Sequence, residues 1–158
     1  MPLGGQERQM EGSIYMREAL KEAEKSYLKD EVPVGAVIVF NNEIIAKAHN
    51  CSISKKDPSC HAEIEVIRLA ANKLKNYRLN ECDLYSTLEP CMMCAGAIVQ
   101  ARIKNLVYAA LDPKSGAIES RDNLLEKKYL NHGTNFFKGP LEKESSDLLK
   151  KFFKSKRN

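Results

Sequence analysis

Two short stretches of the sequence combine the residue types that bind metals and transfer protons. His61 and Glu63 are two residues apart, Cys91 and Cys94 are three residues apart, and each pair follows a loop at the start of a predicted helix. Residues three apart share a helical face, so both cysteines can bind one ion, and the positive end of a helix favours thiolates. One imidazole and two thiolates are ligands that zinc prefers.

Three protein ligands leave the fourth tetrahedral position of zinc for water, which is typical of a catalytic site. Zinc can lower the pKa of that water to about 7, which supplies hydroxide at neutral pH. Glu63 need not bind the ion, and its carboxylate could take the proton from the water and pass it to a leaving group. The residues therefore predict hydrolytic chemistry.

Two other interpretations use the same cysteines. Cys60 or Cys82 could close a structural zinc site, and Cys91 with Cys94 could form a thioredoxin-like redox pair. Neither interpretation gives Glu63 a role. The chain has five cysteines, an odd number, which favours metal or redox chemistry over a disulfide framework in an intracellular protein.

The elements that must hold these residues follow from hydrophobic periodicity and turn residues. Asn41-Asn42 tolerates the positive φ of a tight hairpin turn, and Asp57-Pro58 marks a loop before His61. In chain order the pattern predicts a helix over 13–29 with Ser13 as a candidate N-cap, strands over 34–40 and 43–49, a loop over 50–60, a helix from 61, a strand over 82–88, a helix over 90–102 and a strand over 105–111.

The strand, helix, strand order after residue 82 predicts an α/β fold, in which helices cover a sheet with parallel pairs that begins with an antiparallel hairpin. Beyond Asp112 we predict a short helix over 122–129 and a final helix over 141–153. A chain of 158 residues suits one domain. We assign residues 13–158 to that domain and residues 1–12 to a flexible N-terminus or a cloning remnant.

Composition excludes several classes of protein. Hydrophobic residues make up 43% and charged residues 29% of the chain, as in ordinary globular proteins, which excludes wholesale disorder. The longest apolar stretch, 34–40, is far shorter than the roughly 20 residues of a membrane-spanning helix, so we expect no membrane partner. The first dozen residues lack the apolar core of a secretory signal, which predicts a cytoplasmic protein.

The chemistry-bearing residues and their surroundings resemble a known family. His-Ala-Glu at 61–63 together with Pro-Cys-x-x-Cys at 90–94 is the signature of the zinc-dependent nucleoside and nucleobase deaminases. Further stretches resemble specifically the bacterial tRNA-specific adenosine deaminases, and these lie at residues 33–37, 57–58, 76–79, 87–91, 94–98, 101–103 and 112–117. The resemblance covers most of residues 33–117 and is weaker in the C-terminal third.

The resemblance implies a cytidine deaminase-like fold, a three-layer α/β/α arrangement with a mixed five-stranded sheet between helices. It implies one Zn²⁺ per protomer, held by His61, Cys91 and Cys94, while Glu63 shuttles protons. The implied reaction is the hydrolytic deamination of adenosine to inosine at the wobble position of a tRNA anticodon stem-loop. The implied assembly is a homodimer.

Three further residues are assigned to substrate binding by the same resemblance. Asn50 is expected to hydrogen-bond the flipped base, and Asp112 and Asn131 to shape the nucleotide pocket. An amide both donates and accepts hydrogen bonds, which suits the recognition of a base. For Asp112 and Asn131, capping of the local backbone in a turn is an equal alternative.

The C-terminal tail carries the basic character of the chain. The net charge is +4, and from Lys127 onward nine lysines and arginines stand against three acids. Leu148, Leu149, Phe152 and Phe153 lie among these cations at helical spacing. We predict a basic C-terminal helix whose apolar residues dock on the core and whose cations approach RNA, the alternative for the cations being a merely solvated face.

Two other functions stay open from the sequence. A zinc deaminase of free guanine, cytosine or cytidine would use the same chemistry with a different pocket. A zinc-stabilised RNA-binding module would have no need of Glu63. Glu63→Ala separates this module from an enzyme, because the change should abolish turnover and leave binding nearly intact.

Overall fold

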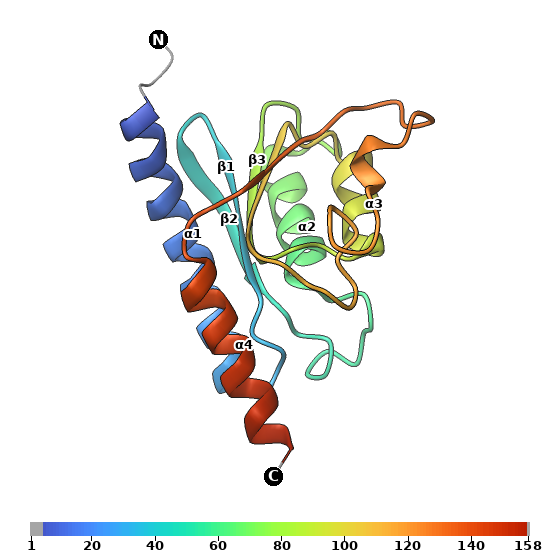
Figure 1. Cartoon of the computed structure of the whole chain (residues 1–158). Helices are drawn as coiled ribbons and strands as arrows, with labels where there is room; N and C mark the ends of the chain where they lie inside the picture. The colour runs from blue at the N-terminus through green and yellow to red at the C-terminus, as the bar shows by residue number, and fades with distance from the viewer. Residues whose placement is uncertain (1–4, 158) are drawn as a thin grey trace.

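Figure 1 shows the computed structural model, which describes the backbone of residues 5–157 and the side chains of residues 12–157. This part of the chain forms four α-helices, one 3₁₀ helix and five strands. Their bounds are α1 Gly5–Leu28, β1 Gly35–Phe40, β2 Glu43–His49, α2 Ala62–Leu74, β3 Asp83–Leu88, α3 Met92–Gln100, β4 Asn105–Ala110, η1 Leu124–Glu126, β5 Asn135–Lys138 and α4 Glu142–Lys156.

The predicted hairpin is formed by β1 and β2. Asn41 and Asn42 at its turn have φ values of 51° and 63°, which are the positive values that a two-residue type I′ turn requires. The two strands pair antiparallel along the whole length of β1. The hairpin prediction is therefore confirmed, including the reason for two asparagines at the turn.

The five strands form one mixed sheet in the order β2-β1-β3-β4-β5. β1 is antiparallel to both of its neighbours, whereas β3, β4 and β5 run parallel to one another. It follows that β2 and β3 point the same way, so α2 and α3, which follow them in the chain, begin at the same end of the sheet (Figure 1). The mixed five-stranded sheet expected from the resemblance is confirmed.

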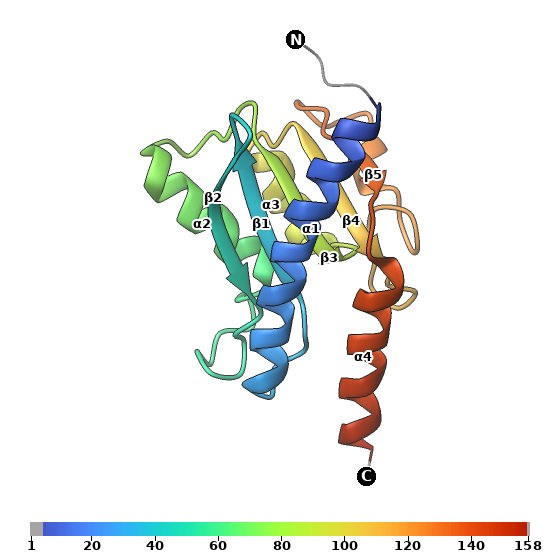
Figure 2. The same ribbon diagram turned by 90° about the vertical axis from the view of Figure 1, so that its left-hand side faces the viewer.

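Helices cover both faces of this sheet. α1 and α4 lie on one face, and α2 and α3 lie on the other (Figures 1 and 2). The larger group of buried side chains includes Val66 of α2, Leu84 of β3 and Ile98 of α3. The smaller group joins Met16 of α1 to Val37 of β1. Each face of the sheet thus buries its own set of apolar side chains, which gives the expected three layers.

Gly35 allows α1 to lie very close to β1. A Cβ atom at this position would be 1.9 Å from the carbonyl oxygen of Ala19 and 2.5 Å from the backbone nitrogen of Ala23. The two facing helix residues are alanines with no exposed surface, so neither helix nor strand carries a bulky side chain at the crossing. The distance between α1 and the sheet therefore depends on this glycine.

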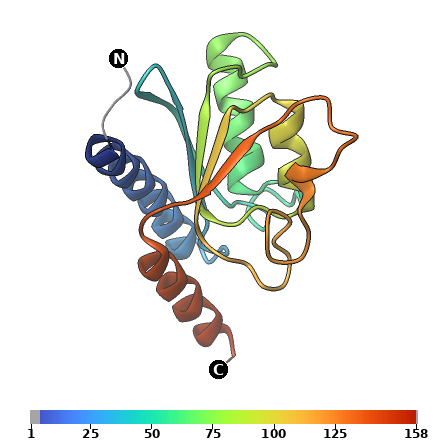
Figure 3. The same cartoon turned by 45° about the horizontal axis from the view of Figure 1, so that its top comes forward.

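The C-terminal helix docks beside α1, as Figure 3 shows. Phe152 is buried and meets the ring of Tyr27 edge-on, with 6.2 Å between ring centroids. Leu149 packs against the larger core, whereas Phe153 is 43% exposed. Docking of the tail is therefore confirmed for Leu149 and Phe152, and the prediction is wrong for Phe153, which faces partly outward.

Two element predictions need correction, and one strand was not predicted. α1 begins at Gly5, so Ser13 lies inside the helix and is not its N-cap. Residues 122–129 contain only the three-residue 3₁₀ helix. Hydrophobic alternation does not identify β5, because this edge strand has only four residues and three of them are exposed. The division into residues 1–12 and 13–158 stays a prediction, and residues 1–4 lie outside the described part of the chain.

The sequence predicts no membrane-spanning helix, and this expectation can be compared with the helices of the described residues. Within residues 5–157, no helix combines the length and the apolar character needed to cross a bilayer.

Candidate active site

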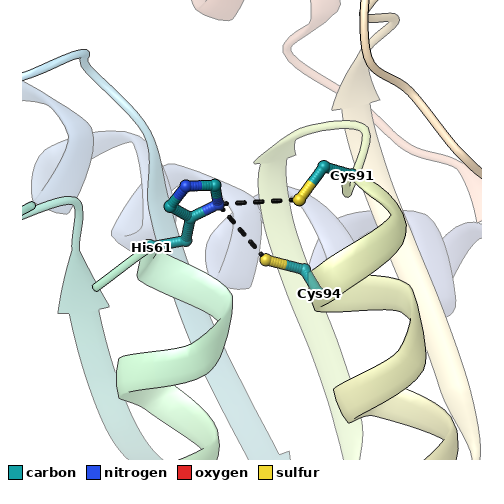
Figure 4. A group of neighbouring side chains, drawn as sticks. All are labelled: His61, Cys91 and Cys94. Atoms are coloured by element: carbon teal, nitrogen blue, oxygen red, sulfur yellow. Dashed lines mark hydrogen bonds between the residues drawn. The ribbon is translucent and has the colours of Figure 1, made fainter. Parts of the chain in front are cut away.

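The starts of α2 and α3 bring together the three residues predicted to bind zinc (Figure 4). His61 is the N-cap of α2, Cys91 is the N-cap of α3, and Cys94 lies in the first turn of α3. The Nδ1 atom of His61 is 3.7 Å from the sulfur of Cys91 and 3.5 Å from the sulfur of Cys94. The three ligand atoms all lie within 4.8 Å of one another.

These distances fit the corners of a zinc coordination tetrahedron. Zinc lies about 2.3 Å from sulfur and about 2.1 Å from nitrogen, which places the nitrogen and sulfur corners of a tetrahedron about 3.6 Å apart. The two separations in this group, 3.5 and 3.7 Å, bracket that value. The donor set and its spacing are therefore suited to zinc.

The two sulfur atoms of this group differ in their affinity for protons. A hydrogen bond from Cys94, opposed by burial, lowers the pKa of the Cys91 thiol to about 4, so Cys91 is a thiolate at neutral pH. The same contact, together with burial, raises the pKa of Cys94. The positive end of α3 adds to the stability of negative charge here. A bound cation would take the place of the proton that the two sulfurs share.

Glu63 lies beside this group in the first turn of α2. It is only 4% exposed, and burial raises the pKa of its carboxyl from about 4.5 to about 7. A carboxyl with a pKa near 7 can both accept and release a proton at neutral pH. Glu63 is not a member of the three-residue ligand group, which agrees with a role in proton transfer rather than in metal binding.

A cavity of about 230 Å³ opens against these residues. It is smaller than the roughly 300–1,000 Å³ typical of sites for drug-sized ligands, so its size suits one planar ring system. Its walls combine apolar side chains with the chemically active groups, and the lining residues are Val32, Val34, Asn50, His61, Glu63, Leu88, Glu89, Cys91, Asp112 and Ser115.

A larger hollow of about 1130 Å³ lies elsewhere on the molecule, bordered by α1, the β1–β2 turn and the first residues of β3 and β4. Neither the three candidate metal ligands nor Glu63 line it. The candidate catalytic residues are therefore at the smaller cavity, and size alone does not locate them.

Comparison with known proteins agrees with this chemistry. A protein-family model described as MafB19-like deaminase matches residues 10–157. The tRNA-specific adenosine deaminase of Aquifex aeolicus is 46% identical over 144 residues, which span 91% of this chain and 95% of that protein. The enzyme of the same name from Bacillus subtilis is also 46% identical over 144 residues, with 91% and 89% covered.

This chain belongs to the tRNA-specific adenosine deaminase family. A solved structure from studies of A-to-I editing by tRNA:A34 deaminases at the wobble position has a TM-score of 0.84 to it. That structure is 44% identical in sequence, and the match covers 87% of this chain and 99% of the other. The cytidine deaminase-like fold implied by the resemblance is confirmed.

Asn50 lines the cavity of this deaminase-family site, next to the end of β2. Its side-chain oxygen accepts a hydrogen bond from the backbone nitrogen of Ala62, at a distance of 2.7 Å. The oxygen therefore holds the start of α2, and the amide NH₂ group is the donor that Asn50 can offer to a bound molecule. The structural and the substrate-binding interpretations of this residue are compatible.

Asp112 also lines the cavity, at the end of β4. Its Oδ1 atom accepts hydrogen bonds from the backbone nitrogens of Lys114 and Ser115, at 3.1 and 3.2 Å. This is the local capping arrangement anticipated as the alternative for this residue. Asp112 therefore lies on the cavity wall and stabilises the turn that follows it.

Asn131 is not brought to the cavity and needs correction as a pocket residue. It is exposed, and its carbonyl oxygen accepts a hydrogen bond from Arg102, just before β4. The site lies at the opposite end of β4, beside Asp112. Six strand residues span about 20 Å, so Asn131 is tethered a whole strand length from the chemistry.

Glu89 is a cavity residue that sequence reasoning missed. Its buried carboxylate accepts hydrogen bonds from four backbone N–H groups of residues 112–120 and from the hydroxyl of Ser120. A Cβ atom at Gly116 would lie 2.3 Å from this carboxylate. The available signal was an acidic residue directly after β3 and directly before Pro90 and Cys91.

The alternative fourth protein ligands do not join the group formed by His61, Cys91 and Cys94. Among the described side chains that could ligate a metal there, neither Cys60 nor Cys82 accompanies His61, Cys91 and Cys94. Cys82 is fully buried at the start of β3, whereas the site is at the end of that strand. The geometry favours an open site over a structural site closed by a fourth protein ligand.

Proposed function

We propose that this chain is a zinc-dependent hydrolase that converts adenosine to inosine at the wobble position of a tRNA anticodon. The observation that carries the proposal is the group formed by His61, Cys91 and Cys94 beside the buried Glu63, on the wall of a cavity sized for one base. Membership of the tRNA-specific adenosine deaminase family supports the choice of substrate.

His61, Cys91 and Cys94 would hold one zinc ion, which activates water as a nucleophile when it is bound. Glu63 takes a proton from the attacking water and delivers it to the exocyclic amino group of adenine. Addition of water to the ring carbon and departure of ammonia leave a carbonyl oxygen, and the product is inosine. Burial of Glu63 keeps its proton affinity in the range that both transfers need.

The cavity shape supports binding of a base that has left its stack. Val32, Val34 and Leu88 give apolar contacts for the faces of a purine, and Asn50 offers an amide donor at the edge. An anticodon loop is single-stranded, so moving one of its bases out of the stack requires less free energy than moving a base out of a duplex. The sugar and phosphates remain outside, where the basic tail could meet them.

We also propose that the enzyme acts as a homodimer in the cytoplasm. Exposed apolar side chains at the start of α3 support an interface there, since Met92 is 75% exposed and Met93 is 37% exposed. All five cysteines are unpaired, which suits a reducing compartment. Light scattering at micromolar concentration tests the assembly, and a monomer there contradicts it.

The function is tested with purified, zinc-loaded protein on an anticodon stem-loop that carries a wobble adenosine. Free adenosine, guanine, cytosine and cytidine are assayed in parallel. We expect inosine in the stem-loop alone, no turnover by Glu63→Ala with zinc retained, and full turnover by Glu24→Ala, a matched change on the exposed face of α1. Turnover of a free base or nucleoside instead overturns the substrate, and failure on all substrates overturns the activity.

A further inference from the structure

A second group of metal-ligating side chains lies outside the catalytic site. Cys51 and Cys60 stand at the two ends of the loop after β2, and Glu65 lies in the first turns of α2. The sulfur atoms of both cysteines and a carboxylate oxygen of Glu65 lie within 4.8 Å of one another. Both thiols are buried, with 8% and 2% of their surface exposed.

Asp57 lies beside this three-residue group, against Cys60. The sulfur of Cys60 is 3.2 Å from Oδ2 of Asp57 and 3.3 Å from Oε1 of Glu65. A thiol has one proton and can donate to only one of these oxygens at a time. Zinc bound to one sulfur and one oxygen holds them about 3.5 Å apart, which is close to the 3.3 Å between Cys60 and Glu65.

The surroundings of the group leave room for a cation. Carboxylate oxygens of both Asp57 and Glu65 face the sulfur of Cys60. Lys55 and Arg68, which pair with Glu65, are more than half exposed and approach it from the solvent side.

A disulfide between the two cysteines explains the group less well. A disulfide has no proton to donate, so the carboxylate oxygens that now face Cys60 would lose a hydrogen-bonding partner beside a buried sulfur. Two sulfurs and one carboxylate oxygen, in contrast, are donors that zinc accepts, and they already lie within 4.8 Å of one another.

We propose that Cys51, Cys60 and Glu65 bind a second thiophilic divalent cation, zinc by its donor set, which fastens the loop between β2 and α2. The loop already closes through a backbone hydrogen bond of 3.0 Å from Cys51 to Cys60. Its two flanking residues are Asn50 and His61, both of which line the catalytic cavity. By fixing the two ends of the loop, the ion would restrict the positions of these two residues.

The first test counts zinc in the purified full-length chain by elemental analysis. We expect two zinc ions per chain, and one in the double variant Cys51→Ser, Cys60→Ser. Cys82→Ser is the matched control, because Cys82 is equally buried and belongs to neither group, and it should keep two. One zinc per chain in both the unchanged protein and the double variant overturns the proposal, as does a Cys51–Cys60 disulfide found by mass spectrometry.

A second variant keeps the test decisive if the double variant does not fold. Glu65→Gln retains both thiols and the size of the side chain, but replaces an anionic donor by a neutral one. We expect one of the two zinc ions to be lost to a chelator at a concentration at least tenfold lower than in the unchanged protein. Identical release curves for the two proteins overturn the assignment, and this readout does not depend on deaminase activity.

Discussion

Two buried glutamates near the metal group have opposite proton affinities because of what surrounds them. Glu63 sits in a desolvated position that raises its pKa to about 7. Glu89 is equally buried, yet the backbone N–H groups and the Ser120 hydroxyl that point at its carboxylate lower its pKa despite that burial. One carboxyl can exchange protons at neutral pH, and the other remains an anion that organises a loop.

Glu89→Gln should destabilise the protein and weaken substrate binding. The amide has one oxygen in place of two and brings an NH₂ group against backbone N–H donors, so several buried donors lose their partner. We expect a loss of about 3 kcal/mol, or about 6–12 °C in Tm, and a raised KM because the Asp112 turn shifts.

Thermal unfolding and steady-state deamination measure these two effects. Glu126→Gln is the matched control, since Glu126 is exposed and should tolerate the change. Equal Tm values for the Glu89 and Glu126 variants would show that the loop does not depend on the carboxylate.

At the scale of elements, the contact of α1 with β1 rests on the absence of one side chain. Gly35→Ala places a methyl group 1.9 Å from the Ala19 carbonyl oxygen, so the helix must move away from the strand. We expect a loss of about 1–3 kcal/mol in the free energy of unfolding, measured by urea denaturation.

Gly133→Ala serves as the comparison for Gly35→Ala, because nothing lies within 4 Å of a Cβ atom at position 133. This variant should unfold at nearly the same urea concentration as the unchanged protein. If both variants behave alike, the close approach of α1 to β1 contributes little to stability.

The elements that sequence could predict are those with a strong local signal. The β1–β2 hairpin follows from two apolar runs around Asn41-Asn42, and α2 and α3 follow from runs of apolar residues after clear loops. The grouping of the three candidate metal ligands follows from residue type and spacing alone. These features are local in the chain, so a local pattern suffices to identify them.

The features that sequence could not predict depend on contacts between distant segments. β5 is too short to show alternation and exists because β4 offers it an edge. Glu89 acquires its role from backbone groups 23–31 residues later in the chain. Asn131 was misplaced because the resemblance weakens there. No local pattern indicates that its loop is hydrogen-bonded to residues just before β4.

At the scale of the whole molecule, α4 places its cations on the outside while Phe152 anchors it to α1. Lys150 and Lys154 are exposed on this helix. Neutralising both, as Lys150→Gln with Lys154→Gln, should weaken binding of the anticodon stem-loop and reduce the slope of log affinity against log salt by about 1–2. Fluorescence anisotropy over a range of salt concentrations measures the slope.

The matched pair for this measurement is Lys73→Gln with Lys75→Gln, two exposed lysines at the end of α2 farthest from its catalytic start. It removes the same total charge from another part of the surface. A salt slope that falls equally in the two double variants would assign the effect to net charge rather than to the C-terminal helix.

The two ends of the described chain differ in how far a tether or a fused protein attached there would obstruct the cavity. α1 starts near the β1–β2 turn, where Tyr15 donates a hydrogen bond to the Asn42 carbonyl oxygen. α4 instead finishes beside Asp30, at the end of the molecule where α2 and α3 begin (Figure 1). A surface tether or fused protein at the start of α1 would therefore leave the cavity mouth facing solution, whereas the same attachment after α4 would crowd the approach of a large substrate.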